Sequence, residues 1–126
     1  MPDIIFQGVD MVKVNIGMRV RVKGRLETVP LIHAGVNWYE AYGTLEVVPE
    51  SEKNVAILSE DEDGSGTIRH ILRLDHFPDR PDRASRLRVS VWFSAPKTLE
   101  AEVTDLGFGS LYPASGRIWH RSIRIT

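Results

Sequence analysis

The stretch MRVRVKGRLETV, residues 18–29, decides the fold class of this chain. Val20, Val22 and Leu26 alternate in it with arginine and lysine side chains. An alternation of period two places apolar side chains on one face of a strand and charged side chains on the other. We therefore expect a β-strand from Met18 to Val29 with one buried face and one face in water.

Other stretches repeat this alternation. The longer predicted strands are Trp38–Val48, Ser85–Ser94 and Gly116–Ile125, and the shorter ones are Ile4–Val9, Val12–Ile16, Val55–Leu58 and Leu99–Thr104. The segment Gly66–Phe77 fits either a strand or a short helix, and we predict a strand. Short strands separated by glycine and proline predict an antiparallel β-sandwich of roughly seven to nine strands. A partly open Greek-key or OB-like β-barrel is the alternative.

The composition is that of one folded domain over residues 1–126. Hydrophobic residues make up 42% and charged residues 26%, a balance typical of globular proteins. The net charge of -1 supplies no overall field that would attract nucleic acid or an anionic membrane. Without cysteine the chain has no disulfide and no thiolate chemistry. An acidic N-terminus and the lack of a long apolar run predict a cytoplasmic protein without membrane contact, or a domain cut from a larger chain.

Two segments between predicted strands are unusually apolar. These are Val29–Val36 and Leu106–Pro113. Apolar and aromatic loops on a rigid β-scaffold commonly contact partners. We therefore predict a non-catalytic binding or assembly module that contacts a protein, a peptide or a second copy of the chain. The predicted binding residues are Leu31, Ile32, His33, Trp38, Trp92, Phe108 and Tyr112.

These two segments have a simpler interpretation. Both can fold back over an open end of the sandwich and complete the core, because surface hydrophobic residues in this number need no special explanation.

A basic strand face gives the first alternative function. Its predicted members are Arg19, Arg21, Lys23 and Arg25. Cations on one strand face can follow a phosphate backbone, and residues 17–27 resemble a strand of a nucleic-acid-binding barrel. This predicts binding of nucleic acid or another polyanion. If Met18–Val29 pairs with Trp38–Val48, however, Glu40 and Glu46 lie among the cations, and the face is an ordinary salt-bridged surface.

A calcium site gives the second alternative. Asp61–Ile68 resembles the first eight positions of an EF-hand calcium loop. The residues at the ligand and turn positions are Asp61, Asp63, Ser65, Gly66 and Thr67. The twelfth position, which holds a bidentate glutamate in that family, is Leu72, so the predicted site is weak. The simpler interpretation is an acidic hairpin turn.

The rest of the sequence carries no enzyme signature. There is no Gly-x-Ser-x-Gly motif, and Gly107 and Gly109 lack the third glycine of a dinucleotide site. The histidines have no metal-site spacing, and a metal centre would have to be assembled from His70, Asp75, His76 and His120. We therefore expect no catalytic residue and no cofactor.

Overall fold

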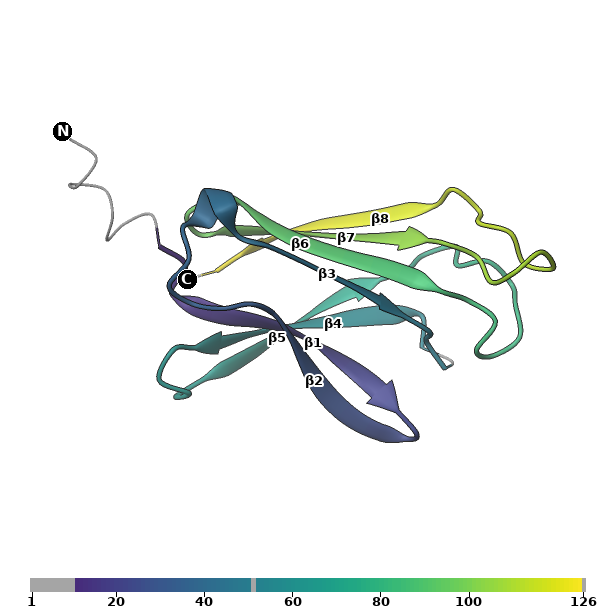
Figure 1. Cartoon of the computed structure of the whole chain (residues 1–126), viewed down its shortest axis with the longest axis horizontal. Coiled ribbons are helices and arrows are strands. Elements are labelled where there is room, and N and C mark those ends of the chain that lie inside the picture. The colour runs from purple at the N-terminus through teal and green to yellow at the C-terminus, as the bar shows by residue number, and fades with distance from the viewer. Residues whose placement is uncertain (1–10, 51, 126) are drawn as a thin grey trace.

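The computed structural model describes residues 11–50 and 52–125, and two antiparallel sheets pack face to face in it (Figure 1). Its strands are β1 (Val14–Val22), β2 (Arg25–Ile32), β3 (Tyr42–Val47), β4 (Asn54–Asp61), β5 (Thr67–Arg73), β6 (Leu87–Ala95), β7 (Thr98–Asp105) and β8 (Ile118–Arg124). A 3-10 turn, η1 (Trp38–Glu40), precedes β3. The predicted β-sandwich is confirmed, and its sheets do not close into a barrel. The predicted strand Ile4–Val9 lies outside the described residues.

The two sheets leave two open sides. The first sheet has the strand order β2-β1-β4-β5, and the second has the order β3-β6-β7-β8. Edge strand β2 contacts edge strand β3 along one side, and edge strand β5 contacts edge strand β8 along the other. We call these the β2–β3 side and the β5–β8 side.

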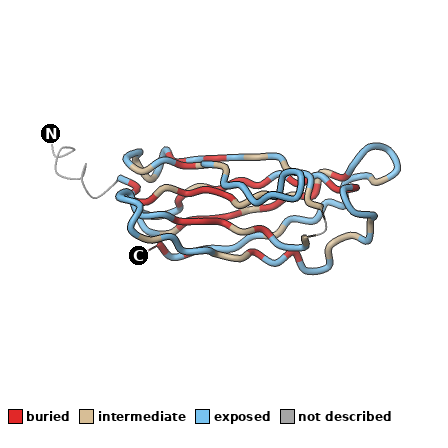
Figure 2. Tube along the Cα trace, turned by 90° about the horizontal axis from the view of Figure 1, so that it is seen from below, coloured by how far each residue is buried: buried red, intermediate tan, exposed pale blue. Residues whose placement is uncertain are grey.

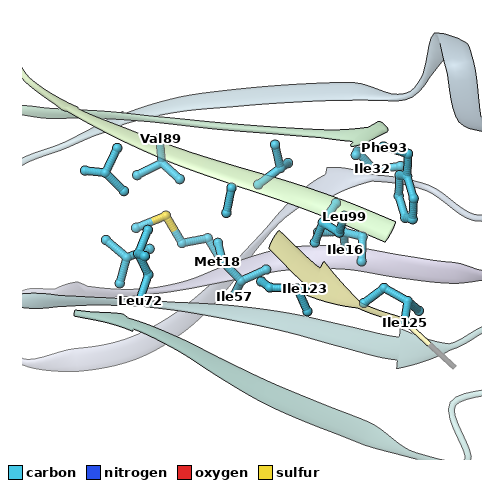
Figure 3. Packing of buried hydrophobic residues seen from close by; sticks show 14 of the residues in the cluster. Ile16, Met18, Ile32, Ile57, Leu72, Val89, Phe93, Leu99, Ile123 and Ile125 are labelled. Atoms are coloured by element: carbon cyan, nitrogen blue, oxygen red, sulfur yellow. The ribbon is translucent and has the colours of Figure 1, made fainter. Parts of the chain in front are cut away.

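The core follows the period of two that the sequence predicts. Ile16 and Ile57 of the first sheet and Val89 and Leu99 of the second are fully buried. Figure 3 shows the side chains of both sheets meeting in one layer. The buried residues concentrate along the strands, whereas the chain is largely exposed in the loops (Figure 2). Burial of each large aliphatic side chain contributes about 1.5–3 kcal/mol, so this layer accounts for most of the hydrophobic stabilisation.

Residues 18–29 form a hairpin instead of the single strand predicted. Lys23 and Gly24 connect β1 to β2 and have φ angles of 52° and 78°. Positive φ at both central positions is the geometry of a type I′ turn, which glycine adopts without strain. The chain therefore reverses at Gly24 although the apolar alternation continues through it.

This reversal also corrects the predicted pairing of Met18–Val29 with Trp38–Val48. β3 pairs with β6 in the other sheet, so Glu46 lies opposite Arg88. The Glu46 carboxylate lies 3.8 Å from the Arg88 guanidinium and 4.0 Å from that of Arg86. The pairing that would place Glu40 and Glu46 among the cations of residues 18–29 therefore does not form.

A buried ion pair holds two long loops together at one end of the sandwich. The Arg80 guanidinium donates to both carboxylate oxygens of Asp105 at 2.7 and 2.8 Å, and these side chains are 6% and 0% exposed. Asp105 also accepts hydrogen bonds from the backbone N–H groups of Gly107 and Ser115. Burial raises the pKa of Asp105, but the hydrogen bonds outweigh burial and hold that pKa well below its ordinary value. The β5–β6 loop is thereby fixed to the β7–β8 loop.

Candidate binding cleft

The β2–β3 side is closed at one end only. A Cβ atom on Gly43 would overlap the backbone carbonyl of Leu31, so only glycine allows β2 and β3 to approach this closely. Beyond this contact the β1–β2 hairpin bends away from β3 (Figure 1). Two-stranded ribbons twist more strongly than wide sheets, which accounts for the divergence.

A cavity of about 870 Å³ lies where the strands diverge, and we call it the hairpin cleft. Its walls come from the β1–β2 hairpin, β3, the β3–β4 connection and parts of β4 and β5. Its apolar lining includes Val20, Val22, Leu26, Leu45, Val47 and Val48. Val22 is 42% exposed and Leu26 is 55% exposed. The cleft is therefore an apolar surface of the size that proteins use to bind ligands.

Some charged side chains at the cleft pair with one another. Arg21 Nε lies 2.9 Å from Glu52 Oε1, and Arg83 Nη2 lies 2.9 Å from Glu50 Oε1. Both glutamates belong to the β3–β4 connection, so the two ion pairs fix this connection as one wall of the cleft. Exposed pairs of this kind are worth about 0.2–1 kcal/mol each.

Three cations at the cleft have no such partner. They are Arg19, Lys23 and Arg69. Within the described structure their side chains make no hydrogen bond and no ion pair. The cleft therefore combines an apolar lining with uncompensated positive charge.

The β5–β8 side is closed by large side chains. The Trp119 indole N–H donates to the backbone carbonyl of Asp75 at 2.8 Å, and its ring stacks on Phe77 with centroids 5.8 Å apart. The Arg121 guanidinium donates to the backbone carbonyl of Ile71. These contacts join β8 to β5 and to the residues that follow β5.

The predicted binding segments lie elsewhere. Ile32 is 3% exposed and belongs to the core, and Leu31 packs against it. This part of Val29–Val36 therefore completes the core, as the simpler interpretation states, and His33 follows it at the surface. Leu106–Pro113 connects β7 to β8 at the opposite end of the sandwich (Figure 1). The two predicted segments therefore lie apart, and partner contact through either of them stays a prediction.

The predicted aromatic binding residues are also separated. Trp38 lies in η1 against the core, and Trp92 stacks on His120 with centroids 6.2 Å apart. Phe108 is 44% exposed, and its backbone N–H donates to the backbone carbonyl of Tyr112 at 2.6 Å. None of these four predicted residues lines the hairpin cleft. Contact with a partner through the β7–β8 loop alone stays a prediction.

The basic strand face is rearranged by the hairpin. Arg19 and Arg21 share one face of β1, but Lys23 lies in the turn and Arg25 pairs with Val22 on the other face. The predicted face of four cations is therefore wrong. The pairings of β1 with β4 and of β4 with β5 instead place Arg69 on the face of Arg19.

The acidic segment forms the predicted hairpin turn, between β4 and β5. The Asp61 N–H donates to the Gly66 carbonyl at 2.9 Å, and the Ser65 N–H donates to the Asp63 carboxylate at 2.8 Å. The Thr67 hydroxyl donates to Glu60 at 3.2 Å. These contacts explain the turn without an ion, and calcium binding by this segment stays a prediction.

The histidines of the hypothetical metal centre are held by separate partners. His70 Nε2 lies 3.1 Å from the Ser59 hydroxyl, whereas His120 Nε2 donates to Glu100 at 2.7 Å. Throughout residues 11–50 and 52–125, no group of three or more histidine, cysteine, aspartate or glutamate side chains is placed to hold a metal ion.

One further polar cluster has the residue types of a catalytic triad. The hydroxyls of Ser94 and Ser122 each donate to Glu100 at 2.6 Å, and these bonds hold the pKa of Glu100 below its ordinary value. A triad requires the serine to donate to the histidine. Because both hydroxyls donate to the carboxylate instead, His120 activates neither serine.

Comparison with protein families shows what this chain is similar to. The family model described as a domain of unknown function, DUF8552, matches residues 11–125. No curated protein matches the chain. In the part of the chain that the structure describes, no helix is long and apolar enough to span a membrane.

Proposed function

We propose that this chain, which belongs to the DUF8552 family, is a non-catalytic binding module that holds an extended apolar segment of a partner protein in the hairpin cleft. The observation that carries the proposal is the cleft of about 870 Å³ with exposed Val22 and Leu26 in its wall. A contiguous exposed apolar surface on a soluble domain usually marks a site of interaction.

The edge strands favour an extended segment as the occupant. β3 is an edge strand without proline, so its outer backbone groups are available for pairing. β2 is also an edge strand but carries Pro30, which has no N–H to donate. An extended chain can add main-chain hydrogen bonds at a free edge while alternate side chains enter an apolar groove.

The chemistry of the lining favours binding over catalysis. The lining that the structure describes contains no serine, threonine, cysteine or histidine side chain. Nucleophilic and acid–base catalysis draw mainly on these residue types and on carboxylates. Glu50 and Glu52, two of the three carboxylates at the cleft, are held in ion pairs with arginines.

The test is binding of a fluorescein-labelled eight-residue peptide with valine and leucine in its centre and serine at both ends. We expect Val22→Lys together with Leu26→Lys to abolish the rise in fluorescence anisotropy, because both positions are exposed and tolerate lysine without unfolding. The matched control is Leu111→Lys with Ile118→Lys, since these side chains are 84% and 58% exposed outside the cleft. Equal loss of binding in both double variants, or no binding by the unmodified protein, would refute the proposal.

Light scattering after size exclusion identifies whether a second copy of the chain is the partner. Self-association that the Val22 and Leu26 double variant removes would place the cleft at a homo-oligomer interface. If the protein stays monomeric at all concentrations, the occupant of the cleft is a different protein.

A further inference from the structure

We infer that the segment held in the hairpin cleft carries acidic residues beside its apolar ones. This inference rests on the proposed function and adds the charge of the partner. Its basis is the charge that the cleft leaves uncompensated.

The charge balance of the lining is positive after internal pairing. The charged lining residues are Arg19, Arg21, Lys23, Arg69, Arg83, Glu46, Glu50 and Glu52. Glu52 pairs with Arg21, and Glu50 pairs with Arg83. Glu46 lies beside Arg88 of β6 and beside Arg86, which precedes β6, and neither arginine is part of the lining. Three cations therefore face the cleft without an anionic partner in the described structure.

Two of these cations, Arg19 and Arg69, share one face of the first sheet. Arg19 is on β1, Lys23 is at the tip of the β1–β2 hairpin, and Arg69 is on β5. β4 separates β1 from β5, and Arg69 is offset from Arg19 by two residues along the strands, so their backbones are roughly 12 Å apart. Acidic residues three or four positions apart in an extended segment can therefore meet both of these arginines, because each extended residue spans about 3.3 Å.

The aliphatic wall favours an acidic peptide over a single-stranded nucleic acid. Proteins that bind single strands combine cations with aromatic side chains on which the bases stack. The described lining of the cleft contains no phenylalanine, tyrosine or tryptophan. Valine and leucine side chains of a peptide suit this wall better than bases do.

The experiment compares three labelled peptides with one apolar centre and with glutamate, serine or lysine at both ends. We expect the glutamate peptide to bind about tenfold more tightly than the lysine peptide at 50 mM salt, because a few exposed ion pairs contribute this much together. The ratio shrinks at 300 mM salt, where the screening length is shorter. Arg19→Glu with Arg69→Glu reverses the preference between the glutamate and lysine peptides, because the charge that these two positions present to the peptide changes sign.

The matched control is Lys97→Glu with Arg117→Glu, two exposed cations outside the lining, which we expect to keep the preference for glutamate. Equal binding of the three peptides would overturn the inference and leave the proposed function standing. Failure of the serine peptide to bind would overturn the proposed function itself. Displacement of the glutamate peptide by oligodeoxythymidine at lower concentrations than by unlabelled peptide would overturn the inference in favour of nucleic acid.

Discussion

The two open sides of the sandwich differ in the size of the side chains that face the gap between the edge strands. On the β5–β8 side, the inward positions of β8 hold Trp119 and Arg121, which reach across to β5 and to the residues that follow it. On the β2–β3 side, the corresponding positions of β3 hold Leu45 and Val47. These side chains are too short to reach the diverging hairpin, so the same architecture yields a sealed side and a cleft.

The β5–β8 side shows that closing the gap between two edge strands depends on long side chains with polar ends. Such side chains bury apolar atoms and also donate hydrogen bonds to backbone carbonyls at the sheet edge. The cleft has neither feature. If the comparison is right, substitutions at the sealed side reduce stability, whereas substitutions at the cleft wall reduce binding.

The largest expected effect concerns the ion pair that anchors the β5–β6 loop beside the sealed side. Asp105→Ala leaves the Arg80 charge buried and unpaired, which costs about 3–5 kcal/mol of unfolding free energy. Urea unfolding measures the change. The control is Arg83→Ala, which breaks the more exposed pair with Glu50 and costs less than about 1 kcal/mol. Equal costs would contradict the description of Asp105 as a structural anchor.

Trp119→Ala tests the seal directly. It removes the stacking on Phe77 and the hydrogen bond to Asp75, and we expect a loss of about 2–3 kcal/mol for this partly buried tryptophan. Leu45→Ala in the cleft wall costs about 1 kcal/mol, because its side chain is already partly exposed. Thermal unfolding of both variants ranks their losses of stability. A larger loss for Leu45→Ala would mean that the cleft is part of the stabilising core.

Gly43→Ala tests the closed end of the β2–β3 side. The new methyl group overlaps the Leu31 backbone, and we expect β2 and β3 to separate at a cost of about 1–3 kcal/mol. Gly66→Ala is the control, since its Cβ would approach only the Asp61 side chain, at 3.2 Å. The unfolding free energies of the two variants, measured with denaturant, should differ clearly. Similar free energies would mean that this contact does not hold β2 and β3 together.

A smaller effect is expected from pH, through His70 of β5. Burial lowers the pKa of His70, and the nearby charge of Arg121 lowers it further. The unfolded chain therefore binds a proton on this side chain more readily, so stability declines as pH falls below about 6.5, the ordinary histidine value. His70→Gln should remove part of the decline between neutral and acidic pH, while exposed His33→Gln should not. An unchanged pH profile in His70→Gln would show that His70 does not cause the decline.

The smallest expected effect is that of calcium. The hydrogen bonds of the turn explain Asp61–Ile68 without an ion, so millimolar calcium should leave the melting temperature unchanged. A rise in melting temperature that Asp61→Ala removes would instead establish a calcium site, because a ligand that binds the native state stabilises it.

The sequence predicted the layers of the fold better than its connections. Alternation identified the strand that became β6, because Leu87, Val89, Val91 and Phe93 are all buried, as the period of two predicts. It failed at residues 18–29, where the period continues through a turn. The dipeptide Lys23-Gly24 was the signal for that turn, since glycine at the second central position suits a type I′ hairpin.

The cleft was not predictable from the same pattern. Val20 and Val22 continue the apolar alternation of β1, and nothing in the neighbouring sequence reveals that Val20 is only partly buried and that Val22 is exposed. Arg69 reaches the cleft through the pairing of β1, β4 and β5, which the sequence alone does not specify. The apolar composition of the sequence therefore pointed to the loops as the binding surface. The hairpin cleft arises instead because β2 and β3 diverge.

The most direct test of the central claim is methyl NMR during titration with the serine-flanked apolar peptide. The account predicts that the methyl signals of Val20, Val22, Leu26, Leu45 and Val47 shift together and saturate, whereas those of Ile123 and Val103 in the core remain in place. Shifts confined to residues of the β7–β8 loop, or no shift at all, would contradict it.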